Sequence, residues 1–214
     1  MQYGSKNINS AISAQMEAEL QVQGNKVTNY FTKIIDIANT LASTVNSSYQ
    51  QVNLDSFETE LVDIVTQNDA LIGSGIWFES GYFTNGIEKI EANATVSTAE
   101  QGMADSEEES SEEETIYYVG PYAMRDNGKI QITYKYSTAD NSYFKQKFYM
   151  MAKEVKSTIL TEPMYDITAR SFKVTAIVPM FTDNVFIGCV TVDVSLDNIC
   201  LLYTSPSPRD MRRS

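Results

Sequence analysis

Two acidic residues far apart in the sequence, Asp166 and Asp193, are placed where they could hold a small molecule. Asp166 follows Pro163 in a turn, and Asp193 closes an apolar strand pattern. A carboxylate at the end of a buried strand costs free energy unless a donor or a cation pairs with it. We therefore expect Asp193 to meet a ligand ammonium, a ligand N–H group, or a cation of the chain such as Arg170 or Lys173.

An aromatic segment supplies the other wall of the expected pocket. Gln146 offers an amide donor and acceptor, Phe148 a ring face and Tyr149 a phenolic donor. The remaining residues expected to line it are Tyr122, Tyr136 and Met164. A few directed contacts inside an apolar lining suit a small polar metabolite. The alternative is that Tyr149 belongs to the core and that Asp193 is satisfied within the chain or caps a turn.

Composition excludes several classes of function. The net charge of −12 argues against nucleic-acid binding, which needs a basic face, and much of it comes from seven carboxylates between Asp105 and Glu114. The chain has no histidine, so Ser–His and Cys–His nucleophile pairs are ruled out. Cys189 lies in an apolar strand pattern and is expected to be buried, and with Cys200 it makes no disulfide framework. We expect no metal and no cofactor; a calcium site in the acidic run lacks the glycine and the spaced ligands of a calcium loop.

Residues 1–50 are expected to form a long stalk helix. Apolar residues recur at spacings of three, four and seven from Ile8 to Val45, and proline is absent. About 40 helical residues span roughly 60 Å, more than one small domain can cover. We therefore expect one end to project, or to pair with a second copy as a homodimer that carries a signal. The alternative is a supporting helix exposed to solvent.

Residues 51–199 read as an α+β module, an antiparallel sheet with helices packed on it. A second helix is expected to start with Asp55 as its N-cap and Glu58 three residues later. Trp77 is expected to anchor the core. The Asp126-Asn127-Gly128 sequence predicts a hairpin turn. The expected strands are 71–79, 116–122, 129–136, 173–179 and 186–194, with a helix over 143–156 between the third and fourth.

Two segments are expected to lie outside this module. Residues 91–115 are rich in Glu, Ser, Ala and Thr. They have too little apolar surface to offset the conformational entropy lost on ordering, so we expect a disordered insert. Residues 200–214 switch to Ser, Pro and Arg without periodicity and read as a foreign or truncation tail. The sequence shows no run of 18 apolar residues and no signal-peptide core, so any membrane attachment is expected through segments absent from this chain.

Several of these features together resemble double Cache sensor domains. They are the long N-terminal helix, the Phe148-Tyr149 pair where the family has Trp-Tyr, the segment 161–166, and Asp193 to Asp197 after an apolar strand. The resemblance covers roughly residues 6–199. It implies a PAS-like, membrane-distal module in the extracytoplasmic part of a bacterial cell-membrane receptor, either a chemoreceptor, a sensor kinase or a cyclic-dinucleotide enzyme.

The resemblance also implies roles for single residues. In the amino-acid-binding members, two aspartates hold the ligand ammonium, and Asp166, Asp193 and Tyr149 fall at ligand-contacting positions. An arginine two positions before the aromatic pair holds the ligand carboxylate, and this chain has Gln146 there. On a helix the flanking lysines, Lys145 and Lys147, would point about 100° to either side of Gln146.

Three functions follow in order of expectation. The first is a sensor domain that binds a small polar metabolite such as an amino acid or a related amine, or alternatively a neutral, pyrimidine-like base that suits Gln146. The second is a structural domain without a ligand. The third is a hydrolase that uses a carboxylate pair, although no spacing in the sequence supports it.

Overall fold

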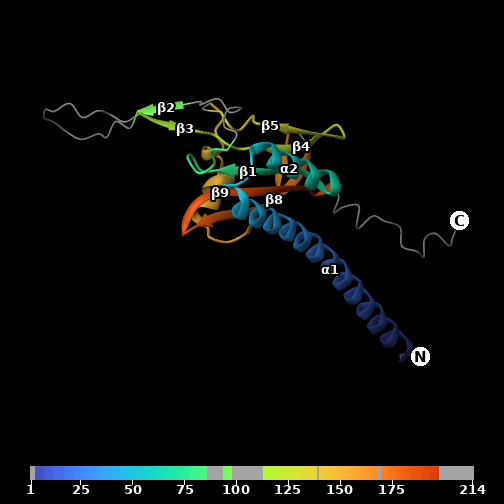
Figure 1. Cartoon of the computed structure of the whole chain (residues 1–214). Helices are drawn as coiled ribbons and strands as arrows, with labels where there is room; N and C mark the ends of the chain where they lie inside the picture. The colour runs from blue at the N-terminus through green and yellow to red at the C-terminus, as the bar shows by residue number, and fades with distance from the viewer. Residues whose placement is uncertain (1–2, 86–93, 98–112, 139, 168–169, 198–214) are drawn as a thin grey trace.

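The computed structural model describes residues 3–85, 94–97, 113–138, 140–167 and 170–197 (Figure 1). A central antiparallel sheet separates two helical layers. Helices α1 (Tyr3–Ser48) and α2 (Leu54–Gln67) cover one face. The short helices η2 (Tyr143–Lys145) and α3 (Lys147–Glu154) lie on the other. The expected α+β class with a PAS-like antiparallel sheet is confirmed.

The main sheet has seven strands in the order β5-β4-β1-β9-β8-β6, and β7 also pairs with β8. Its strands are β1 (Leu71–Phe78), β4 (Tyr122–Asp126), β5 (Lys129–Thr133), β6 (Ile159–Leu160), β7 (Met164–Asp166), β8 (Ser171–Thr182) and β9 (Val185–Ser195). The long strands β8 and β9 form a hairpin beside β1 at the centre of the sheet. They are therefore in position to carry both the core and a site.

Side chains on β8 and β9 alternate between the two faces, as the two-residue period of a strand requires. On β9, Val190, Val192 and Val194 join the core beneath α1 and α2, whereas Thr191 and Asp193 face the other side. On β8 the residues that join the α1 core, Val174, Ala176 and Val178, alternate with Lys173, Thr175 and Ile177. One pair of strands thus serves an apolar face and a functional face.

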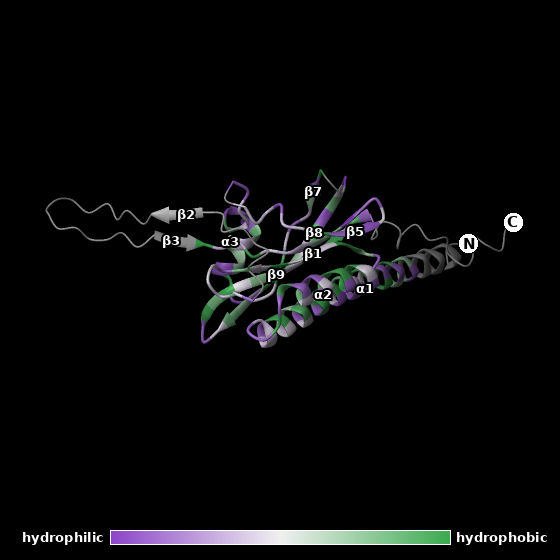
Figure 2. Ribbon diagram, turned by 45° about the horizontal axis from the view of Figure 1, so that its top comes forward, coloured by the Kyte–Doolittle hydropathy of each residue, from purple (hydrophilic) through white to green (hydrophobic). Residues whose placement is uncertain are grey.

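The long N-terminal helix is confirmed, and its two halves differ. The second half contributes buried residues from Ile34 to Val45 to the core and packs on β8 and β9. The first half runs away from the sheet (Figure 1), and Met16 and Leu20 on it are exposed. Figure 2 shows hydrophobic residues interspersed with hydrophilic ones along the part of α1 that lies against the sheet. None of the helices that the structure describes is long and apolar enough to cross a membrane.

The hairpin turn is also confirmed, and other local expectations need correction. Asn127 and Gly128 have positive φ angles of 48° and 78° between β4 and β5, as a type I′ turn requires. The N-cap of α2 is Asn53, whose side chain accepts a hydrogen bond from the Ser56 backbone N–H, rather than Asp55. Asp55 instead lies in the first turn, where its negative charge interacts favourably with the positive end of the helix dipole.

The helix expected over 143–156 is broken into two. A 3-10 turn ends at Lys145, Gln146 is extended with φ −79° and ψ 141°, and α3 starts only at Lys147. Ser142 caps the first turn by accepting a hydrogen bond from the Phe144 backbone N–H. Because the helix starts four residues later than expected, a different set of side chains faces the sheet.

The disorder expected over residues 91–115 is not found at residues 94–97 and 113–115, which form strands. The strands β2 (Ala94–Ser97) and β3 (Glu113–Ile116) pair antiparallel as a separate two-stranded sheet that projects from the main sheet (Figure 1). The segment expected as a strand over 116–122 is therefore divided between β3 and β4. The remainder of the insert and the expected tail, residues 200–214, lie outside the described residues.

Candidate ligand-binding site

A cavity of about 480 Å³ lies on the face of the sheet opposite α1 and α2. This volume falls in the roughly 300–1,000 Å³ range of small-molecule sites. The lining combines aromatic, aliphatic and charged side chains from β1, β4, β8, β9, α3 with its N-cap, and the segments 135–136 and 160–166: Ile72, Trp77, Tyr122, Met124, Arg125, Lys135, Tyr136, Gln146, Lys147, Phe148, Met151, Leu160, Thr161, Glu162, Pro163, Met164, Asp166, Lys173, Thr175, Thr191 and Asp193.

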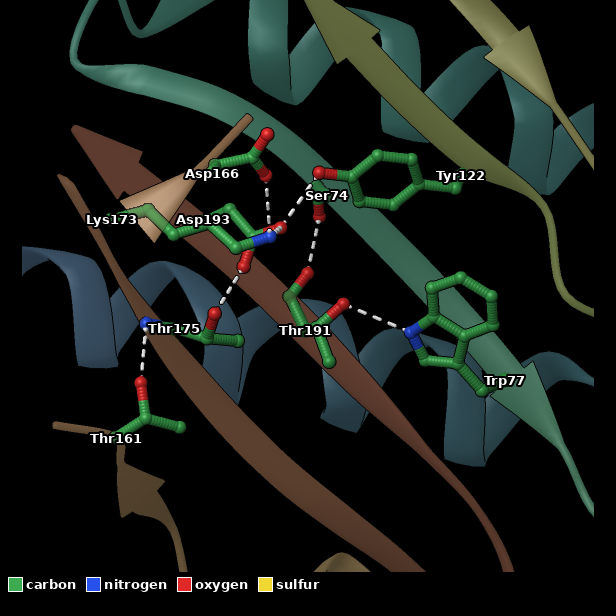
Figure 3. Close-up of polar contacts among 9 residues, drawn as sticks. All are labelled: Ser74, Trp77, Tyr122, Thr161, Asp166, Lys173, Thr175, Thr191 and Asp193. Carbon is green, nitrogen blue, oxygen red and sulfur yellow. Dashed lines mark hydrogen bonds and ion pairs between the residues drawn. The ribbon is translucent and has the colours of Figure 1, made fainter. Parts of the chain in front are cut away.

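Asp193 is the most buried charged group of this cavity, with 4% of its surface exposed. The Tyr122 hydroxyl donates a hydrogen bond of 2.6 Å to Asp193 Oδ2, and the Thr175 hydroxyl donates to Oδ1 (Figure 3). Thr175 is the cross-strand partner of Asp193 in the β8–β9 register. The strand pairing therefore delivers a donor directly to the buried carboxylate.

Lys173 joins Asp193 to Asp166. Its Nζ lies 3.0 Å from Asp166 Oδ2 and 3.3 Å from Asp193 Oδ2, between a carboxylate of β7 and one of β9 (Figure 3). Burial lowers the pKa of Lys173, but the charges of Asp193 and Asp166 and the hydrogen bonds to them outweigh burial and raise it. The ammonium therefore stays protonated, and one of the alternatives expected for Asp193, pairing with Lys173, is found.

Tyr122 reaches Asp193 because two glycines of β1 leave room for aromatic rings. Gly73 pairs with Asp193 across the β1–β9 ladder, and a Cβ on Gly73 would lie 2.0 Å from Tyr122 Oη. A Cβ on Gly75 would lie 2.6 Å from the Trp77 indole. Burial, followed by the charge of Asp193, raises the pKa of Tyr122, which keeps its hydroxyl as a donor.

Trp77 both belongs to the core and lines the cavity. Its indole Nε1 donates a 2.9 Å hydrogen bond to Thr191 Oγ1 (Figure 3). Its ring stacks on Tyr122 at 5.9 Å and contacts Tyr136 and Phe148 at 6.2 and 5.2 Å between centroids. These four aromatic side chains give the cavity a wall of ring faces and edges.

Gln146 and Lys147 lie at the start of α3 and both line the cavity. Since Gln146 is extended, the helical argument that turned Lys147 away from the position of Gln146 is wrong. The amide of Gln146 and the ammonium of Lys147 can both donate hydrogen bonds to a ligand oxygen. Lys145, by contrast, is not among the residues that line the cavity.

The structure brings seven of the eight expected site residues to this cavity and excludes Tyr149. Tyr149 is 2% exposed in the aromatic cluster beside the cavity, and its hydroxyl donates to Glu79 Oε2 at 2.9 Å. Lys153 pairs with the same carboxylate at 3.0 Å. The expected ligand contact of Tyr149 is therefore wrong, and the alternative, a core residue, is found.

The sequence interpretation missed several lining residues. Trp77 was expected mainly in the core, with ligand stacking as the less favoured role, Lys173 was expected only as a partner for Asp193, and Thr175 and Thr191 were not singled out. A signal was present: polar residues alternate with Val and Ala along β8 and β9, so the same period that predicts the core also marks the second face. No comparable signal marks Arg125, whose guanidinium donates to backbone oxygens at the end of α2 and the start of β1.

The domain combines a PAS-like antiparallel sheet with a cavity of small-molecule size on one face. Residues 57–200 match the family described as methyl-accepting chemotaxis protein-like, first PDC sensor domain. The chain belongs to this family, and the resemblance to Cache sensor domains is confirmed. No curated protein matches the chain.

Solved structures share the fold at low sequence identity. The extracellular domains of two proteins assigned as histidine kinases, mmHK1S-Z3 and mmHK1S-Z2, are 21% and 23% identical with TM-scores of 0.60 and 0.61. The matches cover 81% and 85% of this chain, and 55% and 61% of those chains. The ligand-binding domain of the Campylobacter jejuni chemoreceptor Tlp3 in complex with 4-methylisoleucine is 11% identical, with a TM-score of 0.54 over 88% of this chain and 60% of that one. The chain thus spans less than two thirds of the length of these structures.

The close approach at Gly73 gives a first prediction. Gly73→Ala should lower the free energy of unfolding by about 1–3 kcal/mol, because the added methyl group collides with the Tyr122 hydroxyl and separates it from Asp193. Urea denaturation measures the change. Gly24→Ala is the control, since a Cβ at Gly24 meets nothing within 4 Å, and it should cause no loss. Equal stability of the two variants would contradict the role given to Gly73.

The protonated groups of the site give a second prediction. The pKa values of Tyr122 and Lys173 are raised from 10.0 and 10.5, so the folded state holds these protons more tightly than the unfolded state. The stability that these two protons contribute is complete below the unfolded-state pKa values of 10.0 and 10.5. It is lost as pH rises from those values through the higher pKa values of the folded state. The free energy of unfolding should therefore fall above about pH 10, as measured by urea denaturation at a series of pH values. Tyr122→Phe should make the decline shallower, and an unchanged slope would contradict the assignment.

Proposed function

We propose that this domain is the extracellular small-molecule-sensing part of a transmembrane chemoreceptor or histidine kinase. The observation that carries the proposal is the cavity in which two carboxylates, one of them nearly inaccessible, meet a wall of four aromatic rings. A structural domain without a ligand has no need to retain buried charges beside a cavity, since apolar side chains would fill that space at lower cost. The matched family and the structural neighbours are sensor domains of receptors.

The charges around the cavity favour an amino acid or a related amine. Asp166, Asp193 and Lys173 together carry one net negative charge, which a ligand ammonium neutralises. The donors of Gln146 and Lys147 suit a ligand carboxylate, with Lys147 supplying the cation that the family places on arginine. Tlp3, a structural neighbour, binds 4-methylisoleucine, which has both groups.

A neutral planar ring is a second candidate ligand. Lys173 already neutralises part of the charge on the two aspartates, which reduces the need for a ligand cation. The rings of Trp77 and Phe148 offer faces for stacking, and the amide of Gln146 can pair with an amide or imide edge of a pyrimidine-like base.

In this proposal, the long helix α1 transmits the structural effect of ligand binding. The second half of α1 packs on β8 and β9, the strands that carry Lys173 and Asp193 to the cavity. Its first half presents Met16 and Leu20, four residues apart on one side of the helix, with 59% and 71% of their surface exposed. We propose that this apolar surface pairs with a second copy of the chain, so that a shift of the sheet moves two helices together.

A thermal-shift screen tests the ligand site. Amino acids, amines, organic acids and nucleobases would be compared, and at least one amino acid or amine should raise the melting temperature of the wild-type domain. Asp193→Asn should abolish that rise, with affinity reduced at least about tenfold in calorimetry, because a buried charge-assisted contact is lost. Asp183→Asn, in the exposed β8–β9 turn, is the matched control and should bind as the wild type does. Unchanged binding by Asp193→Asn would sink the site assignment, and a response to nucleobases alone would select the second candidate.

Analytical ultracentrifugation tests the dimer. Leu20→Asp should lower the dimer fraction, because a charge on each helix would be buried and face its copy. Asn25→Asp adds the same charge about 140° around the helix and should leave the dimer fraction unchanged. A wild-type protein that stays monomeric at high concentration would contradict this arrangement.

A further inference from the structure

The cavity contains an internal cation at the place where a ligand cation is expected. Lys173 Nζ is within 3.3 Å of one oxygen of Asp166 and one of Asp193, which belong to different strands (Figure 3). The Tyr122 and Thr175 hydroxyls that also contact Asp193 are neutral donors and leave the charge unchanged. The cluster therefore has two negative charges and one positive charge.

The positive charge is permanent under physiological conditions. The neighbouring carboxylates raise the pKa of Lys173 despite its burial, so binding cannot readily discharge it by proton loss. Its side chain is 21% exposed, as is that of Asp166, whereas the Asp193 side chain is 6% exposed. Water therefore screens this cluster only partly, and each added charge has a large effect on binding.

We propose that Lys173 is the specificity-determining residue that limits the ligand to a single ammonium group. This inference rests on the proposed function, and it deepens it by naming the ligand class: monoamines, including α-amino acids, in preference to diamines. One ammonium neutralises the cluster. A second ammonium would enter a cavity whose remaining charged lining residues are three cations, Arg125, Lys135 and Lys147, and one carboxylate, Glu162, so it would meet net positive charge.

A purely structural role for Lys173 makes a different prediction. The ion pairs also connect β7 to β9 on either side of β8, so loss of Lys173 should destabilise the sheet whatever the ligand. Lower stability alone would reduce the affinity for every ligand by a similar factor. The affinity ratio between a monoamine and a diamine of the same length therefore separates the two roles.

The test uses n-butylamine and 1,4-diaminobutane, which differ by one ammonium, with calorimetry on wild type, Lys173→Met and Lys173→Arg. The wild type and Lys173→Arg should prefer butylamine. Lys173→Met should shift the ratio toward the diamine at least about tenfold, because the cluster then carries two negative charges. The double variant Lys173→Met with Asp166→Asn restores one net negative charge, guards against misfolding of the single variant, and should restore the preference for the monoamine.

The outcomes separate this inference from the proposed function. Binding of butylamine or an amino acid with a ratio that Lys173→Met leaves unchanged overturns the inference alone. A shift toward the diamine that the double variant fails to reverse also overturns it, because charge would not be the cause. If neither amine binds to any of these proteins, the inference and the amine assignment both fail, whereas a ligand of another class would still support a sensor.

Discussion

A buried carboxylate on a central strand is the constraint on which the site depends. Asp193 is nearly inaccessible to water, so it requires donors, and these come from two strands: Tyr122 from β4, and Thr175 and Lys173 from β8. The hydrogen bonds and the ion pair of Asp193 constrain the residues at several other positions of the sheet. Gly73 must lack a side chain so that Tyr122 can cross β1, and β7 must lie against β8 so that Asp166 shares the lysine. Removing one partner leaves the buried carboxylate of Asp193 short of a donor, which makes single substitutions in this network costly.

Successive residues of a central strand face opposite sides of the sheet, and the two sides have different roles. Val192 and Val194 pack beneath the helices, and Asp193 between them faces the cavity. The helix α1 and the ligand cavity therefore contact opposite sides of the same two strands, β8 and β9. A change in the twist of that hairpin would reach the helix directly, without an intervening chain of contacts. In the proposed sensor function, the physical path from a ligand in the cavity to α1 is therefore short.

Much of the fold was predictable because local rules and packing agree. The three-and-four spacing of apolar residues predicted α1, the Asn-Gly pair predicted the β4–β5 turn, and runs of apolar residues predicted β8 and β9. The site was less predictable where a difference of one or two positions decides which side chain lines the cavity or caps a helix. Phe148 and Tyr149 were both expected to line the cavity, but consecutive residues of a helix point about 100° apart, and only Phe148 lines it while Tyr149 packs in the core. The choice of Asn53 over Asp55 as the cap is of the same kind, since both residues are good caps two positions apart.

Long-range contacts set the remaining limit. Sequence patterns placed Asp166, Asp193 and Lys173 on separate segments, and nothing in their spacing shows that one ammonium bridges both carboxylates. That geometry arises from the β7–β8–β9 register, which depends on the whole sheet. Sequence reasoning therefore found most of the lining residues and did not find how they share charge.

The alternation along β8 and β9 has a consequence for how such receptors diverge. Positions such as Thr175 and Thr191 contact the cavity, and their immediate neighbours hold the helical layer in place. Substitutions at every second position can alter chemical preference while the intervening ones preserve the scaffold and its link to the output. Homologues with the same architecture can thus acquire new stimuli during evolution without redesigning the machinery that reports them.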